Sequence, residues 1–210
     1  MVKCLIAMVL LPGCTCSEQK GPALPEITAP FRESFDRAEL GPDWLATDPA
    51  AYRIEHGELV ARRAHNRPLW LRRPIPPNAV IELDCWSNDE AGDVKVEAWG
   101  DGKSFASEAS YTSTSYNFIF GGWQNQLSTL ARLDEHGADR KTRTEPRVEK
   151  GRRYHFTIER TGAHLAWRID GQPFLAFDDP QPLAGEAHRY FALNDWEAEL
   201  HFDNLVITPR

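Results

Sequence analysis

Short segments in which apolar and polar residues alternate follow one another from residue 52 to the end of the chain. A period of two is typical of β-strands that bury one face, and no long window shows the period of an amphipathic helix. Turn residues such as His56-Gly57 and Asp170-Gly171 separate the segments, as expected of short strands joined by tight turns. The pattern predicts strands at residues 52–55, 58–63, 68–72, 79–86, 93–99, 115–121, 126–133, 153–160, 164–170, 173–177, 189–193 and 199–207.

The number of predicted strands and the composition together indicate the architecture. The chain has 210 residues and 41% hydrophobic content, which suits one domain with a substantial core. So many short strands favour an all-β fold, a two-sheet antiparallel β-sandwich, over a small barrel. The net charge is -7 and no long basic run is present, which argues against nucleic acid as a partner.

The first residues, MVKCLIAMVLLPGC, have the features of an export signal. Lys3 precedes an apolar run from residue 5 to residue 11 that is too short to span a bilayer as a folded helix. Leu11-Pro12-Gly13-Cys14 then resembles a bacterial lipobox, which implies cleavage before Cys14 and lipid attachment to its sulfur. The alternatives are a signal peptide cut elsewhere and a start codon placed upstream of a soluble protein.

This interpretation divides the chain into three parts. A lipoprotein signal peptide covers residues 1–13, the lipidated Cys14 and a Pro-rich flexible tether cover 14–30, and the folded domain covers 31–210. It predicts a lipoprotein of the cell envelope, periplasmic or on the cell surface, which contacts the membrane only through its lipid anchor. Because Cys16 lies in the tether and Cys85 in a strand, we expect no disulfide, and no Cys and His spacing predicts zinc.

Four segments of the domain carry a resemblance to a known superfamily. FRESFDRAELGPDW opens the domain and LHFDNLVIT closes it, with YRIEHGELVA and GRRYHFTIERTGAHLAWRIDGQPFLAFDDP between them. Together they resemble the concanavalin A-like lectin/glucanase superfamily, as a LamG-like jelly roll, over nearly all of residues 31–208. The resemblance implies a jelly roll whose concave sheet binds glycans. It leaves the activity open, because this fold hosts lectins, hydrolases, lyases and adhesion modules.

Two consecutive predicted strands, IELDCW and VKVEAW, each present two polar residues and a Trp on one face. The six residues between the predicted strands 79–86 and 93–99, SNDEAG, predict a hairpin that would place these faces side by side. Flat indole rings beside charged groups suit a sugar, because C–H groups stack on the rings while hydroxyls take hydrogen bonds. The alternative is an ordinary solvent face covered by a loop. The residues on this expected face are Glu82, Asp84, Trp86, Lys95, Glu97 and Trp99.

The hydrolase hypothesis can be tested against a motif. Laminarinase-type and lichenase-type members of the superfamily carry Glu-x-Asp-x-x-Glu on one strand, which places nucleophile and acid/base on the same face. This chain has Glu82 and Asp84 followed by Ser87 where the second Glu should stand. Glu97 on the next strand is then the remaining candidate for a second carboxylate. No catalytic residue is assigned, and an enzyme is less favoured than a binding module.

The segment SYNFIFGGWQNQLSTLARLDEHG, residues 115–137, interrupts two predicted strands with Gly121-Gly122. The paired glycines relax the backbone beside Trp123, as in a loop that exposes an aromatic ring. One interpretation is a binding rim, in which Trp123, Asn125 and Arg132 contact the ligand. The other is a structural hairpin with a polar cap. A lyase would also need a Tyr or His base near Arg or Gln, and this segment holds such residue types.

Asp36 and Asp203 define a further candidate site. They lie near the two ends of the domain and would be neighbours if the terminal strands pair. Carboxylate oxygens suit Ca²⁺, so a structural calcium site is one interpretation and a pair of turn-stabilising side chains is the other. No cofactor is required by any other feature of the sequence. Three functions follow: a glycan-binding or surface-interaction module, a carbohydrate-active enzyme, or a structural envelope lipoprotein.

Overall fold

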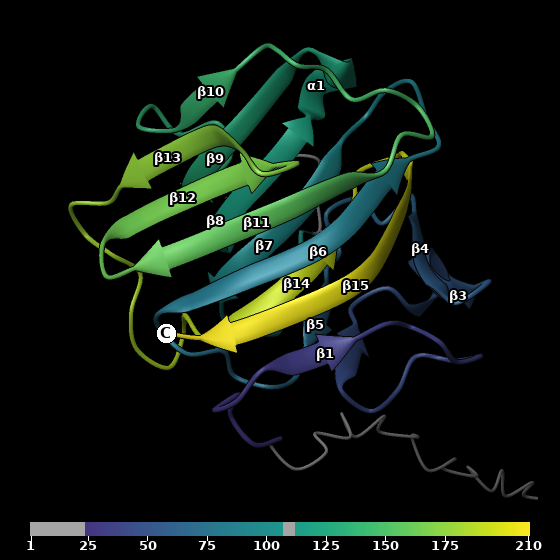
Figure 1. Cartoon of the computed structure of the whole chain (residues 1–210), viewed down its shortest axis with the longest axis horizontal. Coiled ribbons are helices and arrows are strands. Elements are labelled where there is room, and N and C mark those ends of the chain that lie inside the picture. Colours follow the sequence, from purple (N-terminus) through teal and green to yellow (C-terminus); the bar gives the residue numbers. More distant parts are fainter. Residues whose placement is uncertain (1–23, 107–111) are drawn as a thin grey trace, which may run out of the picture.

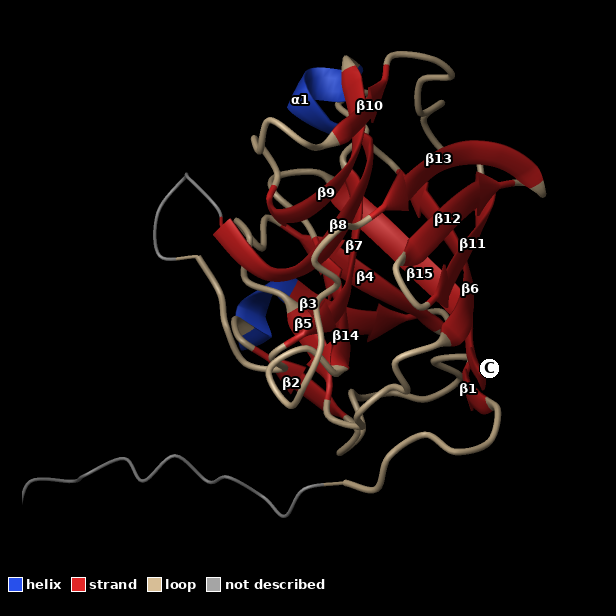
Figure 2. Cartoon of the chain, turned by 90° about the vertical axis from the view of Figure 1, so that its left-hand side faces the viewer, coloured by secondary structure: helices blue, strands red, loops and turns tan. Residues whose placement is uncertain are grey.

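The computed structural model describes residues 24–106 and 112–210 and shows two antiparallel sheets packed face to face (Figure 1). The strand order of the eight-stranded sheet is β13-β12-β11-β6-β15-β4-β3, with β1 also paired to β15. The order of the seven-stranded sheet is β10-β9-β8-β7-β14-β5-β2. Turned by 90°, the two sheets form separate layers, with β8 and β9 in one and β11 and β12 in the other (Figure 2).

The strands have the following bounds. The eight-stranded sheet contains β1 (Phe31–Glu33), β3 (Tyr52–Glu55), β4 (Glu58–Arg62), β6 (Ala79–Ser87), β11 (Tyr154–Thr161), β12 (His164–Ile169), β13 (Gln172–Asp178) and β15 (Glu199–Pro209). The seven-stranded sheet contains β2 (Trp44–Ala46), β5 (Leu69–Leu71), β7 (Val94–Gly100), β8 (Thr112–Gly121), β9 (Leu127–Asp134), β10 (Lys141–Arg143) and β14 (Tyr190–Asn194). A 3-10 turn, η1 (Pro49–Ala51), and a single turn, α1 (Gly122–Asn125), complete the elements.

The two-sheet antiparallel sandwich predicted from alternation is confirmed, and every predicted strand is present within a few residues. The prediction missed β1, β2 and β10. Each of these strands has 3 residues, a length at which alternation is a weak signal, although the equally short β5 was predicted.

The core lies between the sheets and is rich in aromatic rings. Trp167 on β12 contacts Phe118, Phe156 and Phe174 edge-to-face, with ring centroids 5.7, 5.1 and 4.8 Å away. Edge-to-face pairs add to the stabilisation that burial of the rings already supplies. Ile27 also joins the core, and its amide donates to the carbonyl oxygen of Pro74 at 2.9 Å. The packed chain therefore begins ahead of β1.

The expected hairpin between β6 and β7 is wrong. The connection between them carries the chain from the eight-stranded to the seven-stranded sheet. Ile81 and Val94 both face the core from their own sheets, so the polar residues that alternate with them point away from each other. Glu82, Asp84 and Trp86 lie on the outer face of one sheet, and Lys95 and Glu97 lie on the outer face of the other.

Trp99 does not lie on an outer face at all. The register between β7 and β14 shifts where Tyr190 pairs with Gly100 and Phe191 pairs with Ala98. This shift leaves Trp99 as the extra residue of a bulge, with φ of 60°. A bulge breaks the alternation, so the indole turns into the core, where its N–H donates to the carbonyl oxygen of Pro76 at 3.0 Å. The prediction that Trp99 binds a ligand is therefore wrong.

The export features fall outside the described residues. The predicted signal peptide at 1–13 and the lipid attachment at Cys14 both precede residue 24, where the description begins. Within residues 24–106 and 112–210, no helix combines the length and apolar character needed to cross a bilayer.

Candidate ligand-binding pocket

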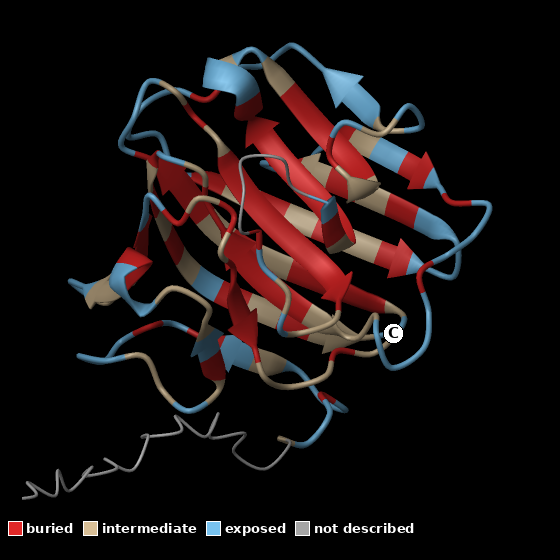
Figure 3. Cartoon of the chain, turned by 180° about the vertical axis from the view of Figure 1, so that it is seen from behind, coloured by how far each residue is buried: buried red, intermediate tan, exposed pale blue. Residues whose placement is uncertain are grey.

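A pocket of about 490 Å³ opens on the outer face of the seven-stranded sheet. Seen from this side, the central strands of the sheet are almost entirely buried, and exposed residues gather around α1 and β10 (Figure 3). Segments that are distant in sequence meet at the pocket: the start of β7, α1, the end of β9 and the loop between β14 and β15. The lining residues are Asn66, Ala91, Asp93, Lys95, Ile119, Trp123, Gln124, Glu135, His136, Trp196, Glu197 and Ala198.

Lys95 lies in the pocket wall and is held by two partners. Its side chain is 2% exposed, and its Nζ donates to Asn66 Oδ1 and Glu135 Oε2, both at 2.7 Å. Alternation places Lys95 on the outer face of β7, and the loops that carry Asn66 and Glu135 close over it. Charge-assisted hydrogen bonds of this length fix all three side chains. The pocket therefore has a rigid polar wall.

Two carboxyl groups next to this wall have strongly raised pKa values. Desolvation raises the pKa of Asp93 to about 7; Lys95 opposes the shift, and Glu135 and Glu197 add to it. Desolvation, followed by the charge of Asp93, raises the pKa of Asp195 to about 8. Burial disfavours the charged form of an acid. Both carboxyls therefore exchange protons near neutral pH.

Trp123 stands at the pocket on a left-handed turn. Trp123, Gln124 and Asn125 have φ values of 51, 58 and 60°, and a left-handed residue with a side chain costs about 1–2 kcal/mol. Gly121 has φ of 71°, and a Cβ there would lie 2.5 Å from Asn125 Oδ1. The indole is 37% exposed and meets the His136 ring edge-to-face at 5.4 Å. Such strain is maintained only where the surrounding structure holds it.

Asn125 holds this turn in place. Its Nδ2 donates to the carbonyl oxygens of Val148 and Glu90 at 2.7 and 3.2 Å, and its Oδ1 accepts from the amide of Val148 at 2.9 Å. Both polar atoms of its side chain are used within the protein, and it is not among the lining residues. Asn125 was predicted to contact the ligand, whereas the structure gives it the role of positioning Trp123.

We expect Asn125→Ala to lower the free energy of unfolding by about 2 kcal/mol or more, because it removes these bonds and leaves Ala with a positive φ. Asn125→Gly is the matched control, since Gly adopts the left-handed backbone without strain and loses only the bonds. Urea denaturation should rank the stabilities as wild type, then Gly, then Ala. Both variants unfolding at the wild-type midpoint would contradict this role.

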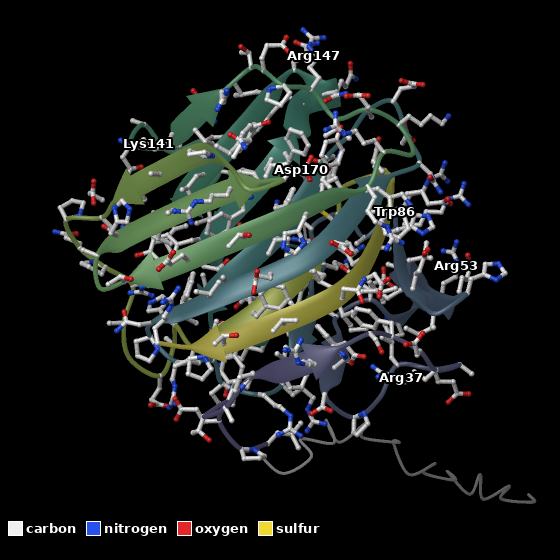
Figure 4. All side chains as sticks on the ribbon, viewed as in Figure 1. Arg37, Arg53, Trp86, Lys141, Arg147 and Asp170 are labelled. Atoms are coloured by element: carbon white, nitrogen blue, oxygen red, sulfur yellow. The ribbon has the colours of Figure 1, made fainter. Side chains whose placement is uncertain are left out.

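Trp86 lies on the opposite side of the sandwich from the pocket. It belongs to the outer face of the eight-stranded sheet, near one end of β6 (Figure 4). Its ring stacks on His201 with centroids 4.9 Å apart, and the guanidinium carbon of Arg153 lies 4.1 Å from the ring centroid. Only 8% of Trp86 is exposed. The predicted sugar face combining Trp86, Lys95 and Trp99 is therefore wrong.

The catalytic candidates are separated in the same way. Asp84 Oδ1 lies 2.9 Å from His155 Nδ1 and Glu82 lies 3.7 Å from His155 Nε2, on the outer face of the eight-stranded sheet. Glu97 lies on the other sheet, completely buried, and accepts from Ser115 Oγ and Asn194 Nδ2, both at 2.6 Å. With the sandwich between them, Glu82 or Asp84 cannot act together with Glu97.

The outer face of β8, which lies beside β7, carries no carboxylate within its described residues. Phe118 and Phe120 face the core, so alternation points Ser115, Asn117 and Ile119 outward. Paired carboxylates on one strand are the arrangement that the hydrolase motif requires. The described residues of β8 therefore do not supply the paired carboxylates of the hydrolase motif.

Arg132 and the predicted calcium ligands have structural partners. Arg132 Nε lies 3.2 Å from Asp179 Oδ2, which also accepts from the hydroxyl of Tyr116 at 2.6 Å, and this network is separate from the pocket. β1 pairs with β15, which is the pairing that the calcium interpretation required. However, Asp203 Oδ2 lies 3.4 Å from Arg153, and no group of three or more His, Cys, Asp or Glu residues in the described chain is arranged to hold a metal. A calcium site at Asp36 and Asp203 is not supported.

Sequence reasoning placed Trp123 and Lys95 among the binding candidates but missed the other polar residues of the pocket. Asp93 and Glu135, and also Trp196, each lie in a loop next to the start or end of a strand. Loops at strand ends commonly carry binding residues, and a Trp between Asp195 and Glu197 was the one available signal. Their convergence depends on the tertiary fold.

Solved structures of carbohydrate-binding and carbohydrate-cleaving proteins share this fold. The carbohydrate-binding module CBM66 from Bacillus subtilis is 14% identical, with a TM-score of 0.60 over 79% of this chain and 95% of its own. The β-glucanase of Bacillus licheniformis is 11% identical, with a TM-score of 0.65 over 88% of this chain and 100% of its own. A lichenase derived from a mouse hindgut metagenome is 11% identical, with a TM-score of 0.61 over 87% and 100%.

These similarities define the fold as a concanavalin A-like jelly roll, as the resemblance in sequence implied. At such low identities they establish the fold alone. No protein family and no curated protein matches the sequence.

Proposed function

We propose that this protein is a glycan-binding module, exported and anchored by lipid in a bacterial cell envelope. The observation that carries the binding function is the pocket on the outer face of the seven-stranded sheet, which Trp123 and Trp196 line together with Asp93, Lys95 and Glu135. Indole surfaces beside convergent hydrogen-bonding groups are what a sugar ring requires, because it has an apolar face and a polar edge.

Three further observations support the proposal. The pocket volume of about 490 Å³ lies within the usual range for small-ligand sites. Structural neighbours include a protein described as a carbohydrate-binding module and others described as glucanases. The lipobox-like Leu11-Pro12-Gly13-Cys14 supports export and anchoring, which would place the module where extracellular glycans occur.

Trp123→Ala and Trp196→Ala are each expected to weaken binding of a glycan by about tenfold or more, because central aromatic residues dominate binding energy. The measurement is a glycan array followed by calorimetric titration of the best hit, on the domain from residue 24 onward. Trp86→Ala is the matched control, since it removes an indole from the opposite face, and it should bind as the wild type does.

An array without hits on folded protein would reject glycan binding and favour a structural envelope protein. A hit that Trp86→Ala abolishes and Trp123→Ala spares would move the ligand to the eight-stranded sheet. For the anchor, Cys14→Ala is expected to release the protein from the membrane fraction of the producing bacterium. Retention of this variant in that fraction would contradict lipid anchoring.

A carbohydrate-active enzyme is the second candidate, and the carboxyl of Asp93 favours it. With a pKa of about 7, this group can hold a proton at neutral pH and donate it to a leaving oxygen. Glu135, in the same pocket, is the available second carboxylate. Asp93→Asn should then abolish turnover of any bound glycan and spare binding. Absence of turnover in the wild type would reject the enzyme and leave the binding module.

A further inference from the structure

The pocket carries more negative than positive charge. Asp93, Glu135 and Glu197 contribute carboxyl groups, whereas Lys95 contributes the single ammonium among the described lining residues. His136 adds an imidazole, and Asp195, which is not a lining residue, is close enough for the charge of Asp93 to raise its pKa. Like charges lining a cleft with low-dielectric walls focus the field on a ligand within it.

The cations near the pocket are engaged by the protein itself. The ammonium of Lys95 donates to Glu135 and Asn66, and it is almost completely buried. Arg140 Nη1 donates to the backbone carbonyl of Glu135 at 2.7 Å, and its guanidinium lies over the Trp123 ring, 5.5 Å from the centroid. An anionic ligand would therefore meet cations whose charge is already directed at protein oxygens.

Glu197, by contrast, has a carboxylate that a ligand can reach. Its side chain is 67% exposed, and His65 Nε2 lies 3.8 Å from Glu197 Oε1. Because it also lines the pocket, this carboxylate can meet a cationic group on the ligand without breaking the Lys95 wall. The position of Glu197 therefore allows the pocket to distinguish ligands by their charge.

We infer that the pocket, within the proposed glycan-binding function, selects saccharide residues by charge. It binds a residue with a free amine more tightly than the neutral residue of the same ring configuration, and it rejects the corresponding uronic acid. The amine gains attraction from Glu197, whereas a uronate adds a further negative charge beside this carboxylate. Juxtaposed like charges across an interface suppress binding of the wrong ligand.

The experiment compares hexosamine, hexose and hexuronate in the gluco, galacto and manno series, so that charge changes while the ring configuration is kept. Ligand-observed NMR titrations at neutral pH and low salt give the affinities. In the series that binds, the amine is expected to bind about tenfold more tightly than the neutral sugar, and the uronate about tenfold more weakly. Glu197→Gln should reduce the amine preference several-fold. Glu145→Gln, which removes an exposed carboxylate that is not among the lining residues, should leave the preference unchanged.

The outcomes separate this inference from the proposed function. Equal affinities across the charge classes, tighter binding of the uronate, or an amine preference that Glu197→Gln leaves intact would overturn the charge selection while glycan binding stands. Failure of all the sugars to bind, on protein shown to be folded, would overturn both.

Discussion

Raising the pH from about 5 to about 9 is expected to lower the free energy of unfolding by several kcal/mol, because Asp195, which is buried, and Asp93, which is partly desolvated, must lose protons in the folded state. Their pKa values are about 7 and about 8 in the folded protein, against an ordinary value of 3.8. Between 3.8 and these values the folded state binds more protons than the unfolded state, so stability falls as pH rises. The stabilisation is complete below 3.8 and lost above about 8.

Urea denaturation across this pH range measures the effect. Asp195→Asn should flatten the decline of stability with pH, since the amide stays neutral at every pH. Adding Asp93→Asn to this variant should flatten the decline further. Asp139→Asn, at an exposed position outside the pocket, is the control and should keep the wild-type slope. A wild-type stability that rises over the same range would refute the raised pKa values.

Lys95→Met is expected to lower the free energy of unfolding by about 3–5 kcal/mol, the usual effect of removing one partner of a buried ion pair. The substitution leaves Glu135, whose side chain is only 12% exposed, without the ammonium that lies 2.7 Å from it. Asn66 Oδ1 loses its hydrogen bond at the same time. An uncompensated buried carboxylate causes most of the loss.

The double variant Lys95→Met/Glu135→Gln tests the cause of this loss. With the carboxylate neutralised, more than half of the lost stability should return, because a buried pair replaced as a unit is often close to neutral. Thermal or urea unfolding of the four proteins completes the cycle. If the double variant is as unstable as the sum of the single ones, the pair is not coupled.

Local sequence patterns predicted the strands well, because alternation of side chains is a property of each strand by itself. β11 and β12, for example, follow the predicted segments almost residue for residue. It was harder to predict which sheet each strand joins, and hence on which outer face of the sandwich its polar side chains lie. The linker SNDEAG has a length that a hairpin and a crossing between sheets can both use, so it does not encode that β6 and β7 belong to different layers.

The pocket was predictable only in part, for a related reason. Trp123 was recognisable as an exposed aromatic residue beside two glycines, and alternation placed Lys95 on an outer face. Asn66, Asp93 and Glu135 come from loops far apart in sequence and meet only in the folded chain. A single bulge removed Trp99 from the surface, and no local residue pattern marks such an insertion.

The left-handed turn that carries Trp123 has a consequence for how a ligand would be received. Immobilising a flexible side chain on association usually costs about 0.5–1.5 kcal/mol. Here the backbone beneath the indole is already locked through Asn125, so the ordering takes place when the protein folds. A ligand then binds an indole that is already ordered, and little binding free energy is spent on rearranging the protein.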